Sequence, residues 1–296
     1  MPVDPLSPTA PFAAEAATAV LAATKAGAAV RDLYDRAAAR VYEKADGSEV
    51  TDADLASDRI IRAMTAERFP ADPILTEEGK DDPARLAHRR CWVVDPIDGT
   101  REFVRRTGEF DVLIALVEDG RPVVGAGYQP TTQRLCLATL GGGAWLRDGD
   151  DAAFAPVRFA PVSDGAAPIL ASTIWFGSPE NQPLLAKIIG RLGGQQTTPL
   201  ETGFSPRTFL PDRHCDSMVG YRPGKTADQQ GMAWEWDFAM PDLFVHEAGG
   251  LVTDMSGRRY VYNKPHPRNG GGLLAAVDPT THARVLAATR AELGLD

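Results

Sequence analysis

Residues 92–100 restrict the possible folds of this 296-residue chain more than any other segment. An apolar run ends at Asp95, a proline then turns the chain, and Asp98 opens the segment that follows. The pattern predicts a buried strand whose end carries two carboxylates that can point into one space. Gly99 allows the backbone to approach a ligand closely, and the amides of Gly99 and Thr100 can face an anion if they begin a helix.

Two further carboxylates stand at the ends of predicted elements. Glu77, followed by Glu78, closes a second apolar run, and Asp237 stands at the start of a predicted helix. Taken alone, each motif has a structural explanation, because Asp-Pro and Asp-Gly are common in turns and Asp is a frequent helix cap. Together, these acidic strand and helix ends favour a magnesium site, in which hard cations join carboxylates to a phosphate.

The composition argues against several classes of function. The 31 Lys and Arg residues against 40 Asp and Glu residues give a formal net charge of −9, which argues against binding of a nucleic acid polymer. The apolar segments are too short or too interrupted for a membrane helix. Cys91, Cys136 and Cys215 are too scattered for a disulfide framework or a zinc site. We therefore expect a cytoplasmic protein without a membrane segment.

Hydrophobic periodicity predicts the order of the elements. Helices are expected at residues 12–41, from residue 51 onward, and at 182–192, 238–248 and 282–293. Strands are expected at 73–76, 91–94, 110–117, 123–128 and 134–139, the last three forming an antiparallel meander with an Asp-Gly turn. Further strands are expected at 169–174, 251–254, 259–262 and 272–277.

An Ala- and Pro-rich stretch, residues 148–168, makes the best domain boundary. It separates an N-terminal α+β domain, residues 12–150, which carries most of the metal site, from a C-terminal domain, residues 151–296. Alternating strands and helices after the boundary favour an α/β class for the second domain, which contributes Asp237 and substrate contacts. The candidate site then lies between the two domains.

The order and spacing of the acidic motifs resemble the inositol monophosphatase superfamily of magnesium-dependent, lithium-sensitive phosphatases. The resemblance runs from about residue 12 to about residue 290. Its motifs are Val50-Thr-Asp-Ala-Asp54, Leu75-Thr-Glu77-Glu78, Asp95-Pro-Ile-Asp98-Gly-Thr100, and Trp236-Asp237 leading to Glu247-Ala-Gly-Gly250. The resemblance implies a mixed α/β (α+β) fold, an αβαβα layered sandwich.

The resemblance also implies which residues bind metal. Glu77, Asp95 and the backbone carbonyl of Ile97 would bind a first Mg²⁺ ion. Asp95 would bridge to a second ion that Asp98 and Asp237 also hold. A third ion is often seen in the superfamily, so two or three Mg²⁺ ions are the expected cofactors.

The remaining motif residues would act on water and phosphate. Asp54 and Thr100 resemble the pair that orients and deprotonates the attacking water, and Asp98 with the amides of Gly99 and Thr100 would hold the phosphate. A threonine hydroxyl is a poor base alone, but a hydroxyl linked to a carboxylate can relay a proton. Phosphoryl transfer needs little covalent help, so charge neutralisation by cations supplies most of the catalysis.

Residues near the core motif resemble one branch of the superfamily, the 3′(2′),5′-bisphosphate nucleotidases. The matching segments are Thr100-Arg-Glu-Phe103, Arg106-Thr-Gly-Glu-Phe110 and Tyr262-Asn-Lys264. Inositol-specific members usually carry Thr-Asn-Phe with a His shortly after, and this chain has neither. Arg101, Arg105 and Arg106 could meet the extra phosphate of a bisphosphate, although a solvated basic turn explains them equally well.

Residues 197–230 depart from the superfamily pattern, which has a recognisable Gly-Ser strand in this region. The candidate substrate contacts here are Ser205, Arg207, Arg222 and Lys225. Lys44 belongs to a loop that closes near the metals in relatives.

The sequence thus predicts an enzyme that hydrolyses a small phosphomonoester with metal-activated water. The expected substrate is 3′-phosphoadenosine 5′-phosphate. An inositol-1-phosphate phosphatase, or one acting on another polyol or sugar phosphate, is the alternative with the same chemistry. A non-catalytic binding protein of the same fold is a remote alternative, because a binder has no need of a water-activating pair. Relatives are often dimers, so a homodimer is a further expectation.

Overall fold

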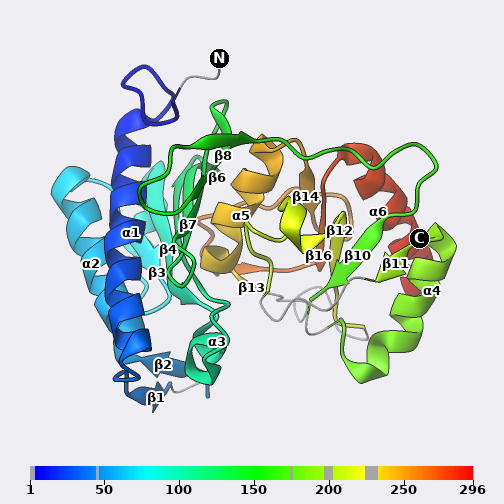
Figure 1. Ribbon diagram of the computed structural model, residues 1–296, viewed down its shortest axis with the longest axis horizontal. Coiled ribbons are helices and arrows are strands. Elements are labelled where there is room, and N and C mark those ends of the chain that lie inside the picture. The colour runs from blue at the N-terminus through cyan, green and yellow to red at the C-terminus, as the bar shows by residue number, and fades with distance from the viewer. Residues whose placement is uncertain (1–3, 45–46, 174–175, 197–202, 224–232, 296) are drawn as a thin grey trace.

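Two β-sheets lie on either side of a central helix, and further helices cover their outer faces (Figure 1). The computed structural model describes residues 4–44, 47–173, 176–196, 203–223 and 233–295. The layers in order are α1 (Ala13–Asp35) with α2 (Asp52–Arg68), a seven-stranded sheet, α5 (Glu235–Glu247), a five-stranded sheet, and α4 (Gln182–Leu192) with α6 (Pro279–Leu293). The predicted αβαβα sandwich is confirmed.

Helix α1 approaches the first sheet closely because its buried face consists mainly of alanine. It ends at Asp35, so the prediction of a helix to residue 41 was wrong. Ala37 adopts a positive φ of 49°, and the chain then forms β1 (Val41–Glu43) against β2 (Glu49–Thr51). Helix α2 begins where the sequence predicted, because Thr51 caps its first amides.

The seven-stranded sheet contains the predicted antiparallel meander. Its strands, in spatial order, are β3 (Ile74–Thr76), β4 (Arg90–Asp98), β5 (Asp111–Glu118), β6 (Arg121–Gln129), β7 (Arg134–Thr139), β8 (Gly143–Asp148) and β9 (Ala155–Val157). Among the described strands of this sheet, β3 alone runs parallel to its neighbour, β4. Asp119 and Gly120, with φ of 48° and 77°, form the predicted turn between β5 and β6. Strand β9 extends this sheet beyond residue 150.

Both faces of this sheet are covered. On β5, Ile114 and its alternate neighbours pack toward α1 and α2, whereas Leu113 and its alternate neighbours pack toward α5. A strand buried on both faces reads as a continuous apolar run, which explains the sequence of this segment.

The second sheet is mixed. Its order is β11 (Gln195–Gln196), β10 (Ile169–Ser172), β12 (Ser217–Gly220), β16 (Leu273–Ala276) and β14 (Leu251–Thr253). Strands β10, β11 and β12 run parallel, and β16 pairs antiparallel with β12 and β14. The predicted helices at 182–192 and 282–293 correspond to α4 and α6, which pack on its outer face.

The prediction of a strand at 259–262 was wrong. Tyr260 and Tyr262 are buried and Val261 is exposed, so the alternation of a strand is present. The backbone amide of Tyr262, however, donates to the carbonyl of Gly120 rather than to a strand. The shorter elements are α3 (Thr100–Arg105), the paired strands β13 (Ala233–Trp234) and β15 (Arg268–Asn269), and 3₁₀ turns at Pro83–Ala87, Pro179–Asn181 and Pro211–Arg213.

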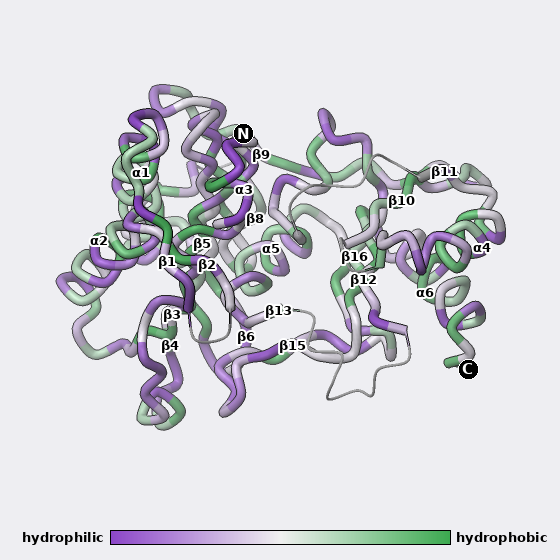
Figure 2. The backbone as a smooth tube through the Cα atoms, turned by 90° about the horizontal axis from the view of Figure 1, so that it is seen from below, coloured by the Kyte–Doolittle hydropathy of each residue, from purple (hydrophilic) through white to green (hydrophobic). Residues whose placement is uncertain are grey.

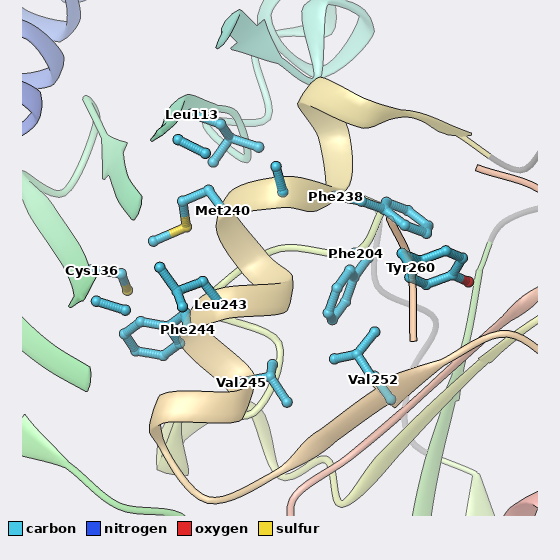
Figure 3. Close-up of a cluster of buried hydrophobic side chains, with 14 of the residues drawn as sticks. Leu113, Cys136, Phe204, Phe238, Met240, Leu243, Phe244, Val245, Val252 and Tyr260 are labelled. Atoms are coloured by element: carbon cyan, nitrogen blue, oxygen red, sulfur yellow. The ribbon is translucent and has the colours of Figure 1, made fainter. Parts of the chain in front are cut away.

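Helix α5 is apolar on nearly all sides because both sheets pack against it. Figure 3 shows Met240 and Leu243 directed toward Leu113 and Cys136 of the first sheet, with other side chains of α5 directed toward the second sheet. The helix begins three residues before the predicted start at 238, which places Asp237 inside its first turn. None of the described helices is long and apolar enough to cross a membrane.

Two helical glycines provide a test of this packing. A Cβ atom on Gly27 of α1 would lie 2.3 Å from the ring of Tyr128, whose hydroxyl donates to Asp150, whereas Gly190 of α4 faces open space. Gly27→Ala is expected to lower the free energy of unfolding by about 1–3 kcal/mol through overpacking. The matched change Gly190→Ala should raise it by up to about 1 kcal/mol, because alanine is the better helix former. Urea denaturation of both variants would measure the difference, and a stabilised Gly27→Ala variant would contradict the packing described.

Candidate active site

Three carboxylates meet where strand β4 ends and helix α5 begins. Oxygens of Asp95, Asp98 and Asp237 all lie within 4.8 Å of one another. They line a cleft of about 610 Å³ together with Glu77, Thr100 and the short helix α3. The fold thus brings Asp95 of β4 next to Asp237 of the central helix, although the two are 142 positions apart in the sequence.

The end of β4 is shaped to direct two carboxylates into one space. The pairing of β4 with β5 shifts in register between Asp95 and Asp98, a bulge of the kind that re-aims side chains. The amide of Ile97 donates to Asp95 Oδ1 at 3.0 Å, and Ser57 Oγ donates to the carbonyl of Pro96 at 2.8 Å. Gly99 follows with a φ of 94°, a conformation that favours glycine.

The third carboxylate is fixed by the start of α5. Asp237 Oδ2 accepts the backbone N–H of Trp234 at 2.7 Å, as an acidic residue in the first turn of a helix commonly does. Pro241, four residues later, has no N–H to give to the carbonyl of Asp237. Pro241 thus lies inside α5, and the carbonyl of Asp237 lacks the usual helical donor.

Asp54 joins the start of α2 to Thr100. Its Oδ2 accepts both the amide and the hydroxyl of Thr51, at 2.8 and 2.6 Å, while its Oδ1 accepts the Thr100 hydroxyl at 2.9 Å. Burial raises the pKa of Asp54 above its ordinary value, although these hydrogen bonds oppose the shift. A buried carboxylate with a raised pKa and a hydroxyl on one oxygen is well suited to accept a proton through that hydroxyl.

The pKa values in the carboxylate cluster indicate a demand for positive charge. Burial, together with repulsion from neighbouring carboxylates, raises the pKa of Asp95 and of Asp98 well above the ordinary range. The same causes raise the pKa of Asp237 to about 7. A cluster made only of carboxylate oxygens fits a hard cation such as Mg²⁺, which would relieve this repulsion.

Glu77 lines the same cleft. Its carboxylate is bound by a lysine side chain, whereas backbone amides bind Asp95 and Asp237. Glu77 follows β3 at the point where that strand runs parallel to β4. Lys44 Nζ lies 2.7 Å from both Glu77 Oε1 and Glu78 Oε1. Burial raises the pKa of Glu78 to about 7 although Lys44 opposes the shift. The Lys44 ammonium is thus the counter-ion of this pair of glutamates.

The arginines near α3 have different surroundings. Arg101 and Arg105 line the cleft. Arg106, a candidate substrate contact, turns away: its guanidinium lies over the Tyr34 ring, 4.3 Å from the centroid, and donates to the Tyr34 carbonyl at 2.6 Å. The structure therefore does not bring Arg106 to the cleft.

The candidate contacts from residues 197–230 are also placed elsewhere. Arg207 is buried and binds Asp111 through two nitrogens, at 3.1 and 2.8 Å, and Glu109 at 3.1 Å. Ser205 Oγ donates to Asp111 at 3.1 Å. Arg222 follows β12 and, like these two, is not among the described residues that line the cleft. Lys225 lies outside the described residues.

Sequence reasoning missed a buried charged group beside the site. Glu235 is fully buried and accepts the amides of Asn263 and Lys264, at 2.6 and 3.1 Å, with the Lys264 ammonium 2.6 Å away. Arg85 holds the same segment through the side chain of Asn263 and the carbonyl of Lys264. The Tyr262-Asn-Lys264 motif therefore secures the start of α5. The sequence signal for this buried group was Glu235 itself, a charged residue between two tryptophans at a helix start.

Comparison with known proteins assigns the chain to a family. Residues 13–209 match the Inositol monophosphatase family. The chain belongs to this family. It is 32% identical over 244 residues to the 3′(2′),5′-bisphosphate nucleotidase CysQ of Salmonella typhimurium, covering 81% of this chain and 90% of that protein. It is 30% identical over 285 residues to the Nus factor SuhB of the same species, covering 93% and 95%.

A solved inositol monophosphatase family structure, CysQ from Bacteroides thetaiotaomicron, superimposes with a TM-score of 0.70. It is 28% identical and covers 90% of this chain and 97% of its own. The predicted resemblance to the inositol monophosphatase superfamily and its CysQ branch is confirmed. As a member of this family of metal-dependent, generally Mg²⁺-dependent, enzymes, the chain is a phosphatase.

Removing one carboxylate tests the electrostatics of the cluster. In the presence of a chelator that removes Mg²⁺, Asp98→Asn should unfold at a higher temperature than the wild type, because one repelling charge is gone. Mg²⁺ at a hundred times its dissociation constant should stabilise the wild type by about 2.7 kcal/mol and the variant by much less. Thermal unfolding with and without Mg²⁺ measures both effects.

The exposed residue Asp164 supplies the control for this experiment. Asp164→Asn makes the same change in charge and should follow the wild type under both conditions. A full Mg²⁺-dependent gain in Asp98→Asn would contradict the role of Asp98 as a ligand.

Proposed function

We propose that this phosphatase removes the 3′-phosphate of a 3′(2′),5′-bisphosphate nucleotide, with 3′-phosphoadenosine 5′-phosphate as the preferred substrate. The observation that carries the proposal is the presence of a proton-accepting pair and a carboxylate cluster in one cleft. Thr100, hydrogen-bonded to Asp54, lines the cleft beside Asp95, Asp98 and Asp237. This arrangement combines what is needed to bind a phosphate monoester and to deprotonate water.

The metal ligands in this proposal are Glu77, Asp95, Asp98, Asp237 and the carbonyl of Ile97, for two or three Mg²⁺ ions. Bound Mg²⁺ would supply positive charge against the phosphate and make water more acidic. The amides of Ile97 and Trp234 fix two of these carboxylates in place. Among the described residues, only Glu77 of this set has an arginine or lysine partner. The site thus has the negative charge that such ions require.

The chain's own residues carry the proton. The attacking water gives a proton to Thr100 Oγ as the Thr100 hydroxyl proton passes to Asp54 Oδ1. The water oxygen then forms a bond to phosphorus while the bond from phosphorus to the ester oxygen breaks. The departing ester oxygen takes up a proton from solvent water, and the alcohol and inorganic phosphate are released. The amides of Gly99 and Thr100 hold the phosphate oxygens. Arg101 and Arg105 add positive charge to the cleft.

The nucleotide preference is supported by the segments around Thr100-Arg-Glu-Phe103 and by similarity to proteins described as 3′(2′),5′-bisphosphate nucleotidases. One observation favours an inositol or other polyol monophosphate as the second candidate. Arg106, a candidate for the second phosphate, is engaged with Tyr34, and Arg207, a candidate substrate contact, is engaged with Asp111. Substrate kinetics must therefore decide between them.

The deciding experiment compares 3′-phosphoadenosine 5′-phosphate and inositol 1-phosphate in the presence of Mg²⁺. We expect kcat/KM to be higher for the nucleotide by about a hundredfold or more, a ratio that differential transition-state binding can supply. Asp95→Asn, prepared in the same way, should release no phosphate and so controls for contaminating phosphatases. A preference for inositol 1-phosphate would contradict the nucleotide assignment and leave the metal site unchanged.

The proton acceptor is tested separately. Asp54→Asn should lower kcat by about 10²–10⁴-fold, the usual contribution of a general base, because an amide cannot take the proton. Its KM and its Mg²⁺-dependent thermal shift should persist, since Asp54 is not a proposed ligand. Asp52→Asn, two residues away and bonded to Arg40 and Tyr42, is the control and should keep the wild-type kcat. A loss below about tenfold in Asp54→Asn would argue against this role.

A further inference from the structure

An exposed cationic side chain that the proposed mechanism does not use is linked to the carboxylate cluster through Trp234. Arg268 of β15 stands directly opposite Trp234 of β13 in their antiparallel pairing. Figure 2 shows these two strands next to each other between the two sheets. The guanidinium carbon of Arg268 is 4.6 Å from the centroid of the Trp234 ring. Trp234 stacks in turn on Trp236, with 4.9 Å between centroids and 12° between planes.

This stack is attached to the metal-binding cluster. The residue that carries the ring, Trp234, donates its backbone N–H to Asp237 Oδ2 at 2.7 Å. Arg268 is exposed and is not among the described residues that line the cleft; its link to the cluster is Trp234, at the start of α5, whereas Arg101 and Arg105 of α3 line the cleft itself.

The Arg268 guanidinium is held in place by an aromatic ring and, among the described residues, has no acidic partner. In the described parts of the chain its side-chain contact is the Trp234 ring, and it forms no ion pair with a carboxylate. A guanidinium stacked on a ring keeps its N–H groups free at the edge of its plane, in the fork geometry that matches a phosphate. Because the ring already restrains the side chain, less freedom is lost when an anion binds.

We propose that Arg268 is a specificity-determining residue that binds a second phosphate of the substrate, with Trp234 as its platform. The inference rests on the proposed function in one respect, since it takes the substrate to be a bisphosphate. The scissile phosphate occupies the carboxylate cluster, and the second phosphate extends toward the β13–β15 pair. A monophosphate lacks the group that Arg268 recognises.

The test uses two substrates that differ by one phosphate, adenosine 3′,5′-bisphosphate and adenosine 3′-monophosphate. Arg268→Ala should raise KM for the bisphosphate by about tenfold or more, because a charge-assisted contact is lost, and leave KM for the monophosphate unchanged. kcat should change little for either substrate. Arg268→Lys, which keeps the charge but not the planar fork, should fall between the wild type and Arg268→Ala.

Two further variants distinguish recognition from general effects. Trp234→Leu removes the platform but keeps the backbone bond to Asp237, and should raise KM for the bisphosphate less than Arg268→Ala does. Arg259→Ala removes an exposed arginine with the same change in net charge and should match the wild type. Thermal unfolding verifies that each variant is folded.

The outcomes separate this inference from the proposed function. The assignment of Arg268 would be overturned if Arg268→Ala changed KM equally for both substrates or left both KM values unchanged. It would also be overturned if a further variant, Arg101→Ala, alone raised KM for the bisphosphate. If the wild type hydrolyses inositol phosphates and neither adenosine ester, the nucleotide preference fails. The same variants are then compared on inositol 1,4-bisphosphate and inositol 1-phosphate, where a KM effect limited to the bisphosphate supports Arg268 and its absence overturns it.

Discussion

Repulsion among Asp95, Asp98 and Asp237 is the constraint on which the rest of this structure depends. Like charges this close disfavour ionisation, and burial adds to the effect. The carboxylates are held together by the buried strand β4, by helix α5 between two sheets, and by backbone amides that donate to Asp95 and Asp237. Packing elsewhere in the molecule therefore maintains an unfavourable arrangement that a cation makes favourable.

The parts of the fold that neighbouring residues determine could be predicted from the sequence. The Asp119-Gly120 turn and the meander around it follow from positive-φ residues between apolar runs. Thr51 starts α2 because a capping residue and its acidic partner are three positions apart. The carboxylates of the candidate site were found for the same reason: each stands at the end of an element whose limits the sequence marks.

Contacts between distant residues could not be predicted in this way. Arg207 pairs with Asp111, 96 positions away, and a long arginine side chain gives no sequence signal for which carboxylate it will reach. Arg106 carries the same charge as Arg101, yet the Tyr34 ring and carbonyl attract it away from the cleft. The irregular segment around Tyr260 and Tyr262 has the alternation of a strand, but its partner is a turn.

Helix α5 gives the core a direct influence on catalytic geometry. Met240, one turn beyond Asp237, packs against the first sheet where Gly125 and Gly127 leave room, with added Cβ atoms coming within 3.1 Å of its side chain. Met240 is three residues from Asp237 in the same helix, so a larger residue at either glycine would press on Met240 and, through the backbone, on the turn that carries Asp237. The spacing between the carboxylates of the candidate site is then a mechanical property of the interior, and it depends on two glycines that lie outside the lining of the cleft.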